Sequence, residues 1–322
     1  MTRLYPLRFE PIFRRYLWGG RRLGEVLDKD IGHDSCAESW EVVDHGADQS
    51  IVRNGPLTGM TLRALTDQHG AELLGVHHPQ TAFPLLWKFV DAQQPLSVQV
   101  HPNDAQAAQL DPPDLGKTEA WVVLAAEPGS VIYAGLKPGF DCTVLRREIS
   151  RGTCERCLHC FEPQVGDCVF IPAGTVHALG AGLLVGEIQQ ASDTTYRLYD
   201  WNRLGPDGEA RELHVEQGLE VIDFQRGPVA LQTVTATDHP NKHTLVSCEK
   251  FILNRWQFDR EITMPADKRC HIIACVEGSV TVLAESGEER LGKGGTMLLP
   301  ATIGAVRWRA AGPTVLLDAF LP

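Results

Sequence analysis

Short runs of β-branched and aromatic residues, separated by Gly, Pro, Asn and Asp, constrain the fold of this chain most strongly. Runs of about four to eight such residues between turn-forming residues are typical of the strands of β-sandwiches and barrels. They recur along the chain, at 39–44, 96–100, 120–126, 130–135, 168–173, 183–190, 251–259, 271–285 and 294–301. The sequence therefore predicts a mainly β fold.

Three segments depart from this pattern and place apolar residues at helical spacing. Leu recurs with that spacing in 61–75, and the segments 141–152 and 214–224 show a similar periodicity. Each segment lies between strand-like runs. We expect helices that are added to a β core, with one small helical segment over about 57–80.

The length and an internal echo indicate two domains. A chain of 322 residues exceeds the usual size of one compact domain. After Phe224 the sequence becomes rich in turn residues, and G-G-T-M-L-L-P-A (294–301) echoes G-D-C-V-F-I-P-A (166–173), as in a degenerate duplication. The later copy has no His after its Pro-Ala turn. We therefore expect a domain with the functional site over 1–225 and a β domain without metal ligands over 226–322.

Four side chains in three separate segments offer metal ligands: Gln99, His101, Glu119 and His177. Residues i and i+2 of a strand project from the same face, so Gln99 and His101 in L-S-V-Q-V-H can reach one ion. Glu119 opens a strand-like run, and His177 follows a Pro-Ala-Gly turn that closes another. Such a shell suits Zn²⁺, Mn²⁺, Co²⁺ or Fe²⁺, and the two His favour Zn²⁺. Taken singly, each His also fits a hydrogen-bonded core residue, and Glu119 a solvated strand end.

Charge and composition exclude several classes of partner. The formal net charge is −11, which argues against a surface for nucleic acid or anionic membrane. No apolar run reaches the length of a membrane-spanning helix, and Arg residues interrupt the first 20 residues, unlike a signal peptide. Nine Cys at irregular spacing indicate free thiols in a reducing compartment. We expect a cytoplasmic protein.

The tightest Cys cluster allows a second metal site as a lesser alternative. Cys154, Cys157 and Cys160 follow a C-x2-C-x2-C pattern with His159 inside it, and this spacing would place the thiols on one side of a helical turn. A structural zinc site usually takes a second pair of ligands from elsewhere, and Cys168 lies inside a predicted strand. Free thiols are therefore the preferred interpretation.

Longer motifs carry a family resemblance. Gly166, Pro172, Gly174 and His177 give G-x5-P-x-G-x2-H, which resembles the second motif of the cupin superfamily of jelly rolls. The fuller set resembles the short bacterial form of the type I mannose-6-phosphate isomerase family. It comprises Y-L-W-G-G (16–20), A-E-S-W (37–40), L-S-V-Q-V-H-P-N-D (96–104), G-K-T-E (116–119), P-A-G-T-V-H-A-L (172–179), Q-Q-A-S-D-T-T-Y-R-L-Y-D-W-N-R (189–203) and R-E-L-H (211–214).

This resemblance implies two cupin-type jelly-roll domains and an aldose–ketose isomerase. The implied reaction interconverts mannose 6-phosphate and fructose 6-phosphate through a cis-enediol, with proton transfer between C2 and C1. The implied metal ligands are the same four side chains, holding one Zn²⁺ per chain, with Mn²⁺ or Co²⁺ as alternatives. The implied partner is a small sugar phosphate, and we expect a monomer or a weak homodimer.

The resemblance also assigns roles to individual residues. Arg197 matches an arginine that is treated as catalytic in the family, and a permanently charged guanidinium suits an enediolate oxygen. Lys117 and Asp193 are further candidates for proton transfer or for orienting other groups, and the identity of the base stays open. Four residues are expected to bind substrate: Ser97, Arg203, Trp18 and Glu38. Arg203 stands where some relatives have Lys, and it is expected to bind the phosphate.

Two other functions remain as alternatives. A cupin that binds a sugar phosphate without turnover would keep the same cavity, although every implied ligand and Arg197 are present. A metal-dependent cupin oxygenase would use Fe²⁺ and O₂, but an amide ligand and an arginine-rich segment fit that chemistry poorly.

Overall fold

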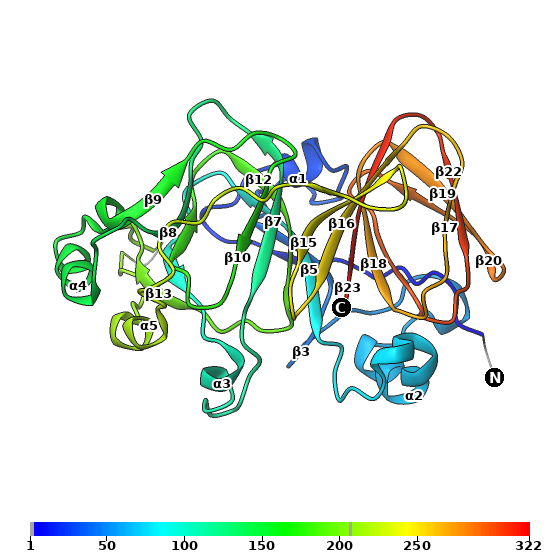
Figure 1. Ribbon diagram of the computed structural model, residues 1–322, viewed down its shortest axis with the longest axis horizontal. Coiled ribbons are helices and arrows are strands. Elements are labelled where there is room, and N and C mark those ends of the chain that lie inside the picture. The colour runs from blue at the N-terminus through cyan, green and yellow to red at the C-terminus, as the bar shows by residue number, and fades with distance from the viewer. Residues whose placement is uncertain (1–2, 206–207) are drawn as a thin grey trace.

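The computed structural model describes residues 3–205 and 208–322, and its first part is a barrel of two facing antiparallel sheets (Figure 1). The six-stranded sheet has the order β1 (Ile12–Arg14), β2 (Glu38–Val42), β5 (Leu85–Ala92), β12 (Leu183–Gln190), β7 (Glu119–Ala126) and β10 (Cys168–Ile171). The five-stranded sheet has the order β13 (Tyr196–Tyr199), β6 (Val98–Val100), β11 (His177–Leu179), β8 (Ile132–Leu136) and β9 (Leu158–Phe161).

The C-terminal part forms a second pair of antiparallel sheets beside the first (Figure 1). Its six-stranded sheet has the order β14 (Thr235–Ala236), β15 (Lys242–Ser247), β16 (Ile252–Phe258), β23 (Thr314–Phe320), β18 (His271–Glu277) and β21 (Thr296–Leu299). Its four-stranded sheet has the order β17 (Ile262–Met264), β22 (Val306–Ala310), β19 (Ser279–Ala284) and β20 (Gly287–Gly292). The two barrels confirm the predicted mainly β jelly-roll architecture.

Helices are additions to this β core, as predicted. The three expected helices form as α2 (Leu62–Leu74), α4 (Cys142–Ser150) and α5 (Val215–Val221). The shorter elements are α1 (Arg22–Glu25), α3 (Asp104–Ala107), the 3₁₀ turns η1 (Gly55–Leu57), η2 (Gly75–His77) and η3 (Cys154–Cys157), and a ribbon of β3 (Asp44–His45) and β4 (Asp48–Gln49). Among the described residues, no helix is long and apolar enough to span a membrane.

Helix α2 shows how local sequence fixes an element. Its N-cap Thr61 accepts a hydrogen bond from the amide of Ala64, which satisfies one of the donors left free at a helix start. The helix ends at Gly75, whose φ of +57° suits glycine. A Cβ at this position would lie 2.1 Å from the carbonyl oxygen of Lys268, so a glycine also permits the close approach to the C-terminal barrel.

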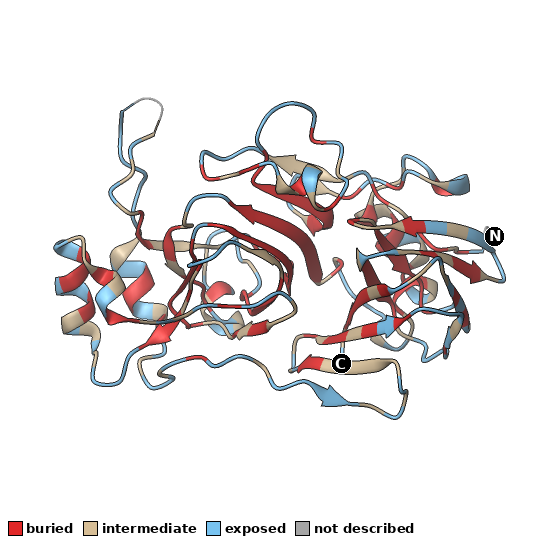
Figure 2. Ribbon diagram, turned by 90° about the horizontal axis from the view of Figure 1, so that it is seen from above, coloured by how far each residue is buried: buried red, intermediate tan, exposed pale blue. Residues whose placement is uncertain are grey.

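The central six-stranded sheet of the first barrel is covered on both faces. Every residue of β5 and β12 is buried, and burial colours this sheet almost continuously in Figure 2. Alternate side chains point to opposite faces of a strand, so Val90 packs inside the first barrel whereas Phe89 packs toward the second. The strands therefore read as largely apolar runs, in which Lys88 and Glu187 face the barrel interior and Asp91 shares the outer face of Phe89.

The two barrels share one hydrophobic cluster, which contains Phe89 and Ile188 from the first and Leu253 and Leu317 from the second. Helix α2 contributes to it and hydrogen-bonds the C-terminal half through the carbonyl of Leu73. The division at residue 225/226 falls between α5 and β14, and it stays a prediction.

Candidate active site

One row of polar side chains lies on the five-stranded sheet. Gln99 on β6 is the register partner of both His177 on β11 and Arg197 on β13. Neighbouring register positions on one face lie side by side, so the three side chains form a row across the sheet. His101 follows directly after β6, two residues beyond Gln99, and lies beside this row.

A second row lies on the facing six-stranded sheet. Glu187 on β12 is the register partner of Lys88 on β5 and of Trp121 on β7. Glu119 and Trp121 are two apart on β7 and share a face, and Glu38 on β2, the register partner of Val90, lies beside this row. The barrel closure thus places Glu119 opposite His101 and His177, which sequence spacing alone does not specify.

Three buried side chains form a cluster with the composition of a metal centre. One ligand atom from each of His101, Glu119 and His177 lies within 4.8 Å of the others. The His177 Nε2 atom is 3.3 Å from Glu119 Oε1, and the His101 Nε2 atom is 3.6 Å from Glu119 Oε2. All three side chains are at most 1% exposed, so bulk water does not solvate the carboxylate.

Backbone carbonyls set the tautomers of both imidazoles. His101 Nδ1 donates to the Thr194 carbonyl at 2.9 Å, and His177 Nδ1 donates to the Thr175 carbonyl at 2.8 Å. Because a carbonyl only accepts, each Nδ1 carries the proton and each Nε2 presents a lone pair toward Glu119. Burial lowers the pKa of His177 to about 3 and, with the nearby Lys117 charge, lowers the pKa of His101. Neutral rings with free Nε2 atoms are the form that binds a metal.

Lys117 and Gln99 complete the surroundings of this cluster. The Lys117 ammonium donates to Glu119 Oε2 at 2.7 Å and to His101 Nε2 at 3.0 Å, so it contacts two of the atoms that would ligate an ion. The Gln99 amide donates to His177 Nε2 at 3.3 Å. A turn of that amide would present its oxygen instead, so the donor set fits one divalent cation.

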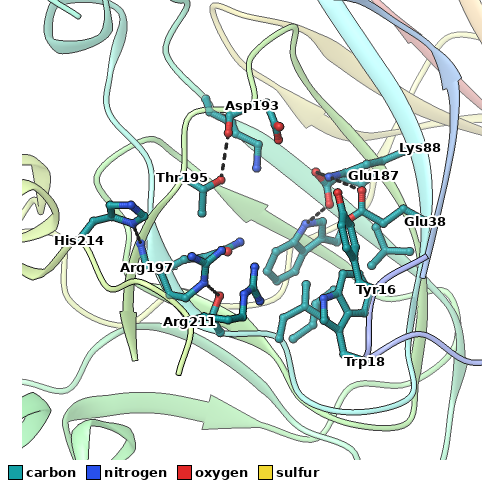
Figure 3. Close-up of a pocket in the computed structure, with 17 residues that line it drawn as sticks. Tyr16, Trp18, Glu38, Lys88, Glu187, Asp193, Thr195, Arg197, Arg211 and His214 are labelled. Atoms are coloured by element: carbon teal, nitrogen blue, oxygen red, sulfur yellow. Dashed lines mark hydrogen bonds and ion pairs between the residues drawn. The ribbon is translucent and has the colours of Figure 1, made fainter. Parts of the chain in front are cut away.

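A cavity of about 330 Å³ opens beside this cluster and holds most of the predicted site residues (Figure 3). Seven predicted site residues line the cavity: Gln99, Trp18, Glu38, Ser97, Lys117, Asp193 and Arg197. Trp18 is buried, whereas Asp193 is exposed at the rim. The volume suits a small polar molecule.

Arg197 is oriented by two contacts. Its Nε donates to Ser97 Oγ at 3.2 Å and its Nη1 donates to the Glu212 carbonyl at 3.2 Å. Burial and the charge of Arg211 lower the pKa of Arg197, although an arginine stays protonated. Among the described residues, no hydrogen bond joins Asp193 to Arg197.

Arg203 does not line this cavity. It forms an ion pair with Asp200 and lines an adjoining cavity of about 710 Å³. Arg211 lines both cavities, and its Nη1 lies 3.8 Å from Asp200 Oδ2. Arg211 was not among the site residues predicted from the sequence, although R-E-L-H was recognised as a motif.

Lys88 and Glu187 are cavity residues that the sequence analysis missed. The Lys88 ammonium lies 3.3 Å from Glu187 and 3.6 Å from Glu38, and Trp121 Nε1 donates to Glu187 at 3.1 Å (Figure 3). Burial raises the pKa of the Glu187 carboxyl. Burial alone would lower the pKa of Lys88, but the charges of Glu187 and Glu38 outweigh it and raise that pKa. A charged residue between apolar neighbours of a strand-like run was the available signal at both positions.

The Cys cluster does not assemble a second centre. Cys154 and Cys157 lie buried on η3, but Cys160 lies exposed on β9, so the three thiols are not on one helical turn. Burial raises the pKa of Cys157 to about 11, which favours the thiol over the thiolate that binds metal. All nine Cys are free. Within 3–205 and 208–322, the cluster of His101, Glu119 and His177 is the one grouping of this kind.

Comparison with known proteins agrees with this geometry. The model of the type I phosphomannose isomerase catalytic domain matches residues 7–119, and that of the mannose-6-phosphate isomerase cupin domain matches 241–313. Mannose-6-phosphate isomerase ManA of Bacillus subtilis is 35% identical over 310 residues, which cover 93% of this chain and 94% of ManA. The chain belongs to the type I phosphomannose isomerase family.

A second relative and a solved structure support the membership along the whole chain. The mannose-6-phosphate isomerase of Streptococcus mutans is 33% identical over 298 residues, covering 92% of this chain and 93% of that protein. The crystal structure of the mannose 6-phosphate isomerase from Bacillus subtilis superposes with a TM-score of 0.90 at 31% identity, covering 98% and 99% of the two chains. A Salmonella typhimurium phosphomannose isomerase mutant, at 16% identity and a TM-score of 0.79, shares the fold.

Proposed function

We propose that this protein interconverts mannose 6-phosphate and fructose 6-phosphate through a cis-enediol. The observation that carries the proposal is the placement of the His101–Glu119–His177 cluster beside a small cavity that Arg197 also lines, in a chain of this family. Aldose–ketose isomerisation needs polarisation of two oxygens and a proton transfer between adjacent carbons. The cavity residues supply groups for each requirement.

The ion in this proposal is Zn²⁺, one per chain, held by His101, Glu119, His177 and Gln99. Two neutral imidazoles, a buried carboxylate and an amide oxygen support zinc, and Mn²⁺ or Co²⁺ would fit the same donors. When bound, such an ion acts as a Lewis acid that polarises carbonyl and hydroxyl oxygens. Nine free thiols support the cytosol as the location of the protein.

Arg197 stabilises the negative charge of the enediolate in this account. Its guanidinium is held by Ser97 and Glu212 before substrate arrives, so little reorganisation accompanies the reaction. Ser97 contributes its hydroxyl to substrate binding from the same strand region. Trp18 and Glu38 form the part of the cavity wall against which the sugar carbons pack.

The phosphate is bound where the two cavities adjoin. Arg211 lines both of them, and Arg203 lines the outer one, so the two guanidinium groups flank the junction. Their shared partner Asp200 leaves a net positive charge that suits a phosphate dianion. Arg203 thus keeps its predicted role, with Arg211 as an added phosphate ligand.

Glu187 is the strongest candidate for the base that moves the proton between C2 and C1. Its carboxyl is buried in the cavity wall, and its pKa is raised toward the range in which a base works best at neutral pH. The Lys88 ammonium, 3.3 Å away, holds this carboxyl in place and favours its charged form. Lys117 binds a substrate oxygen next to the ligand cluster, and Asp193 at the rim relays protons to water.

Product identification tests this function. Purified protein loaded with zinc is incubated separately with mannose 6-phosphate, glucose 6-phosphate and mannose, and the sugars are identified by NMR. Fructose 6-phosphate is expected from mannose 6-phosphate, with far slower conversion of unphosphorylated mannose because the arginines have no anion to bind. Binding without any turnover would favour a sugar-phosphate sensor, and oxygen uptake with bound iron would favour an oxygenase.

A further inference from the structure

The turn between β12 and β13, residues 191–195, connects three parts of the candidate active site. The Thr194 carbonyl accepts the Nδ1 proton of His101, and Asp193 and Thr195 line the cavity. The same turn leads directly into β13, which carries Arg197. Its position therefore determines the orientation of a ligand, the cavity rim and a cationic group together.

This turn lies outside any strand, and one backbone hydrogen bond, from the Ala191 amide to the Pro84 carbonyl, joins its start to another segment. Side-chain contacts hold the rest of the turn. Asp114, from the loop between α3 and β7, supplies the largest set of these contacts. Its Oδ2 accepts from Ser192 Oγ at 2.8 Å and from Thr194 Oγ1 at 2.7 Å. Its Oδ1 accepts from the Leu115 amide at 2.8 Å and lies 3.1 Å from His45 Nε2.

Hydrogen-bond donors therefore surround the Asp114 carboxylate. A carboxylate offers about four lone-pair positions, and four donors occupy them here. Its side chain is 15% exposed, so water replaces few of these bonds. Gln189 adds a second hold, because its amide donates to the Ser192 carbonyl at 2.6 Å.

We infer that Asp114 is a positioning residue for the metal centre. By fixing the hydroxyls of Ser192 and Thr194, it places the Thr194 carbonyl where it accepts from His101 Nδ1, and this keeps the Nε2 lone pair available as a ligand. The inference rests on the proposed function for its metal centre, but the tautomer of His101 is independent of turnover. Outer partners of metal-bound His typically contribute about 10- to 100-fold to metal affinity.

The test uses full-length protein and two matched pairs of variants. Asp114→Asn removes the carboxylate, and Asp111→Asn makes the same charge change on the same loop at an exposed position. Thr194→Val removes one hydroxyl at nearly constant volume, whereas Thr194→Ser keeps the hydroxyl and loses only the methyl group. The tautomer of His101 is read from long-range ¹H–¹⁵N NMR spectra of metal-free protein, and zinc affinity is read from competition with a fluorescent chelator.

We expect the parent, Asp111→Asn and Thr194→Ser to show His101 with its proton on Nδ1. Asp114→Asn and Thr194→Val are expected to show a mixture of tautomers and a zinc dissociation constant raised by about 10-fold or more. A pure Nδ1–H tautomer with unchanged zinc affinity in both of these variants would overturn the inference. If Asp114→Asn does not fold, the Thr194 pair decides. If the parent isomerises no sugar, the tautomer readout still decides, so the two failures are distinguishable.

Discussion

At position 197 a preorganised guanidinium lines the cavity beside the ligand cluster, and its removal gives the first prediction. Arg197→Ala should lower kcat by about 100- to 1,000-fold, because one donor to developing negative charge is lost. Zinc content should stay at the parental level, because Arg197 contacts none of His101, Glu119 and His177. Steady-state kinetics and metal analysis check this, with the exposed Arg309→Ala as the control. An unchanged kcat would contradict the role.

The two arginines around Asp200 give a second prediction at this scale. Arg211→Ala and Arg203→Ala should each raise KM for mannose 6-phosphate, by about 10-fold or more, with a smaller effect on kcat, because phosphate binding is lost from both ground and transition states. Arg211→Ala should have the larger effect, since Arg211 lines both cavities. A change confined to kcat in both variants would contradict phosphate binding here.

Residue chemistry singled out the three side chains that the structure brings into one cluster, and it did not single out Arg211 beside Arg203. Gln99 and His101 were recognisable from their i, i+2 spacing, and His177 from its glycine turn. Lys88 was missed because the run 85–92 was not among the predicted strands. Glu187 lies in a predicted strand, but its pairing with a charge on the neighbouring strand is not visible along one strand. The contact of Arg203 with Asp200 depends on a local turn that residue types alone do not specify.

At the scale of elements, the strands of the second barrel carry a buried charge cluster outside the active site. His271 on β18 lies between Asp318 Oδ1 at 2.7 Å and Asp267 Oδ1 at 3.1 Å. Burial would lower the pKa of His271, but the two carboxylates outweigh it and raise the pKa from 6.5 to about 9. The charged imidazole therefore ties β18 to β23 and to the loop before β18.

This cluster predicts a pH-dependent stability. A raised folded-state pKa gives a stabilisation that is complete below about pH 6.5 and is lost as the pH rises through about 9. The melting temperature should fall over that interval, and His271→Gln should remove this part of the decline. Calorimetry from pH 6 to 10 measures it, with the exposed His33→Gln as the control. Parallel curves for the parent and His271→Gln would contradict the coupling.

Elements were predictable where their periodicity was local. Helix α2 follows its Leu spacing, and strand β12 follows its predicted apolar run. The run that forms β5 was not among the predicted strands. The order of strands in each sheet was not predictable, because long-range register depends on packing between segments far apart in the chain. That register is what aligns Glu187 with Lys88.

For the whole molecule, the shared cluster between the barrels makes the two halves interdependent. Phe89 and Ile188 on one sheet pack toward Leu253 and Leu317 on the other, and the N-terminal segment bridges Leu7 to Leu298. The internal echo predicted two β units, but it gave no sign of this continuous core. The outer faces of the strands make these contacts. The sequence of a strand that is buried on both faces does not indicate which element covers its outer face.

The shared core predicts cooperative unfolding. The full chain should melt in one calorimetric transition, and a fragment of residues 1–225 should aggregate because it exposes the apolar outer face of its central sheet. Calorimetry of the full chain and size-exclusion chromatography of the fragment measure these outcomes. A monomeric fragment that binds zinc with parental affinity would show that the first barrel is independent.

The account as a whole depends on a metal held by His101, Glu119, His177 and Gln99. The most direct test measures conversion of mannose 6-phosphate to fructose 6-phosphate by the purified protein before chelation, after chelation and after zinc is returned. Activity should fall to background on chelation and recover with about one zinc per chain. Full activity in protein shown to be free of metal would contradict the account.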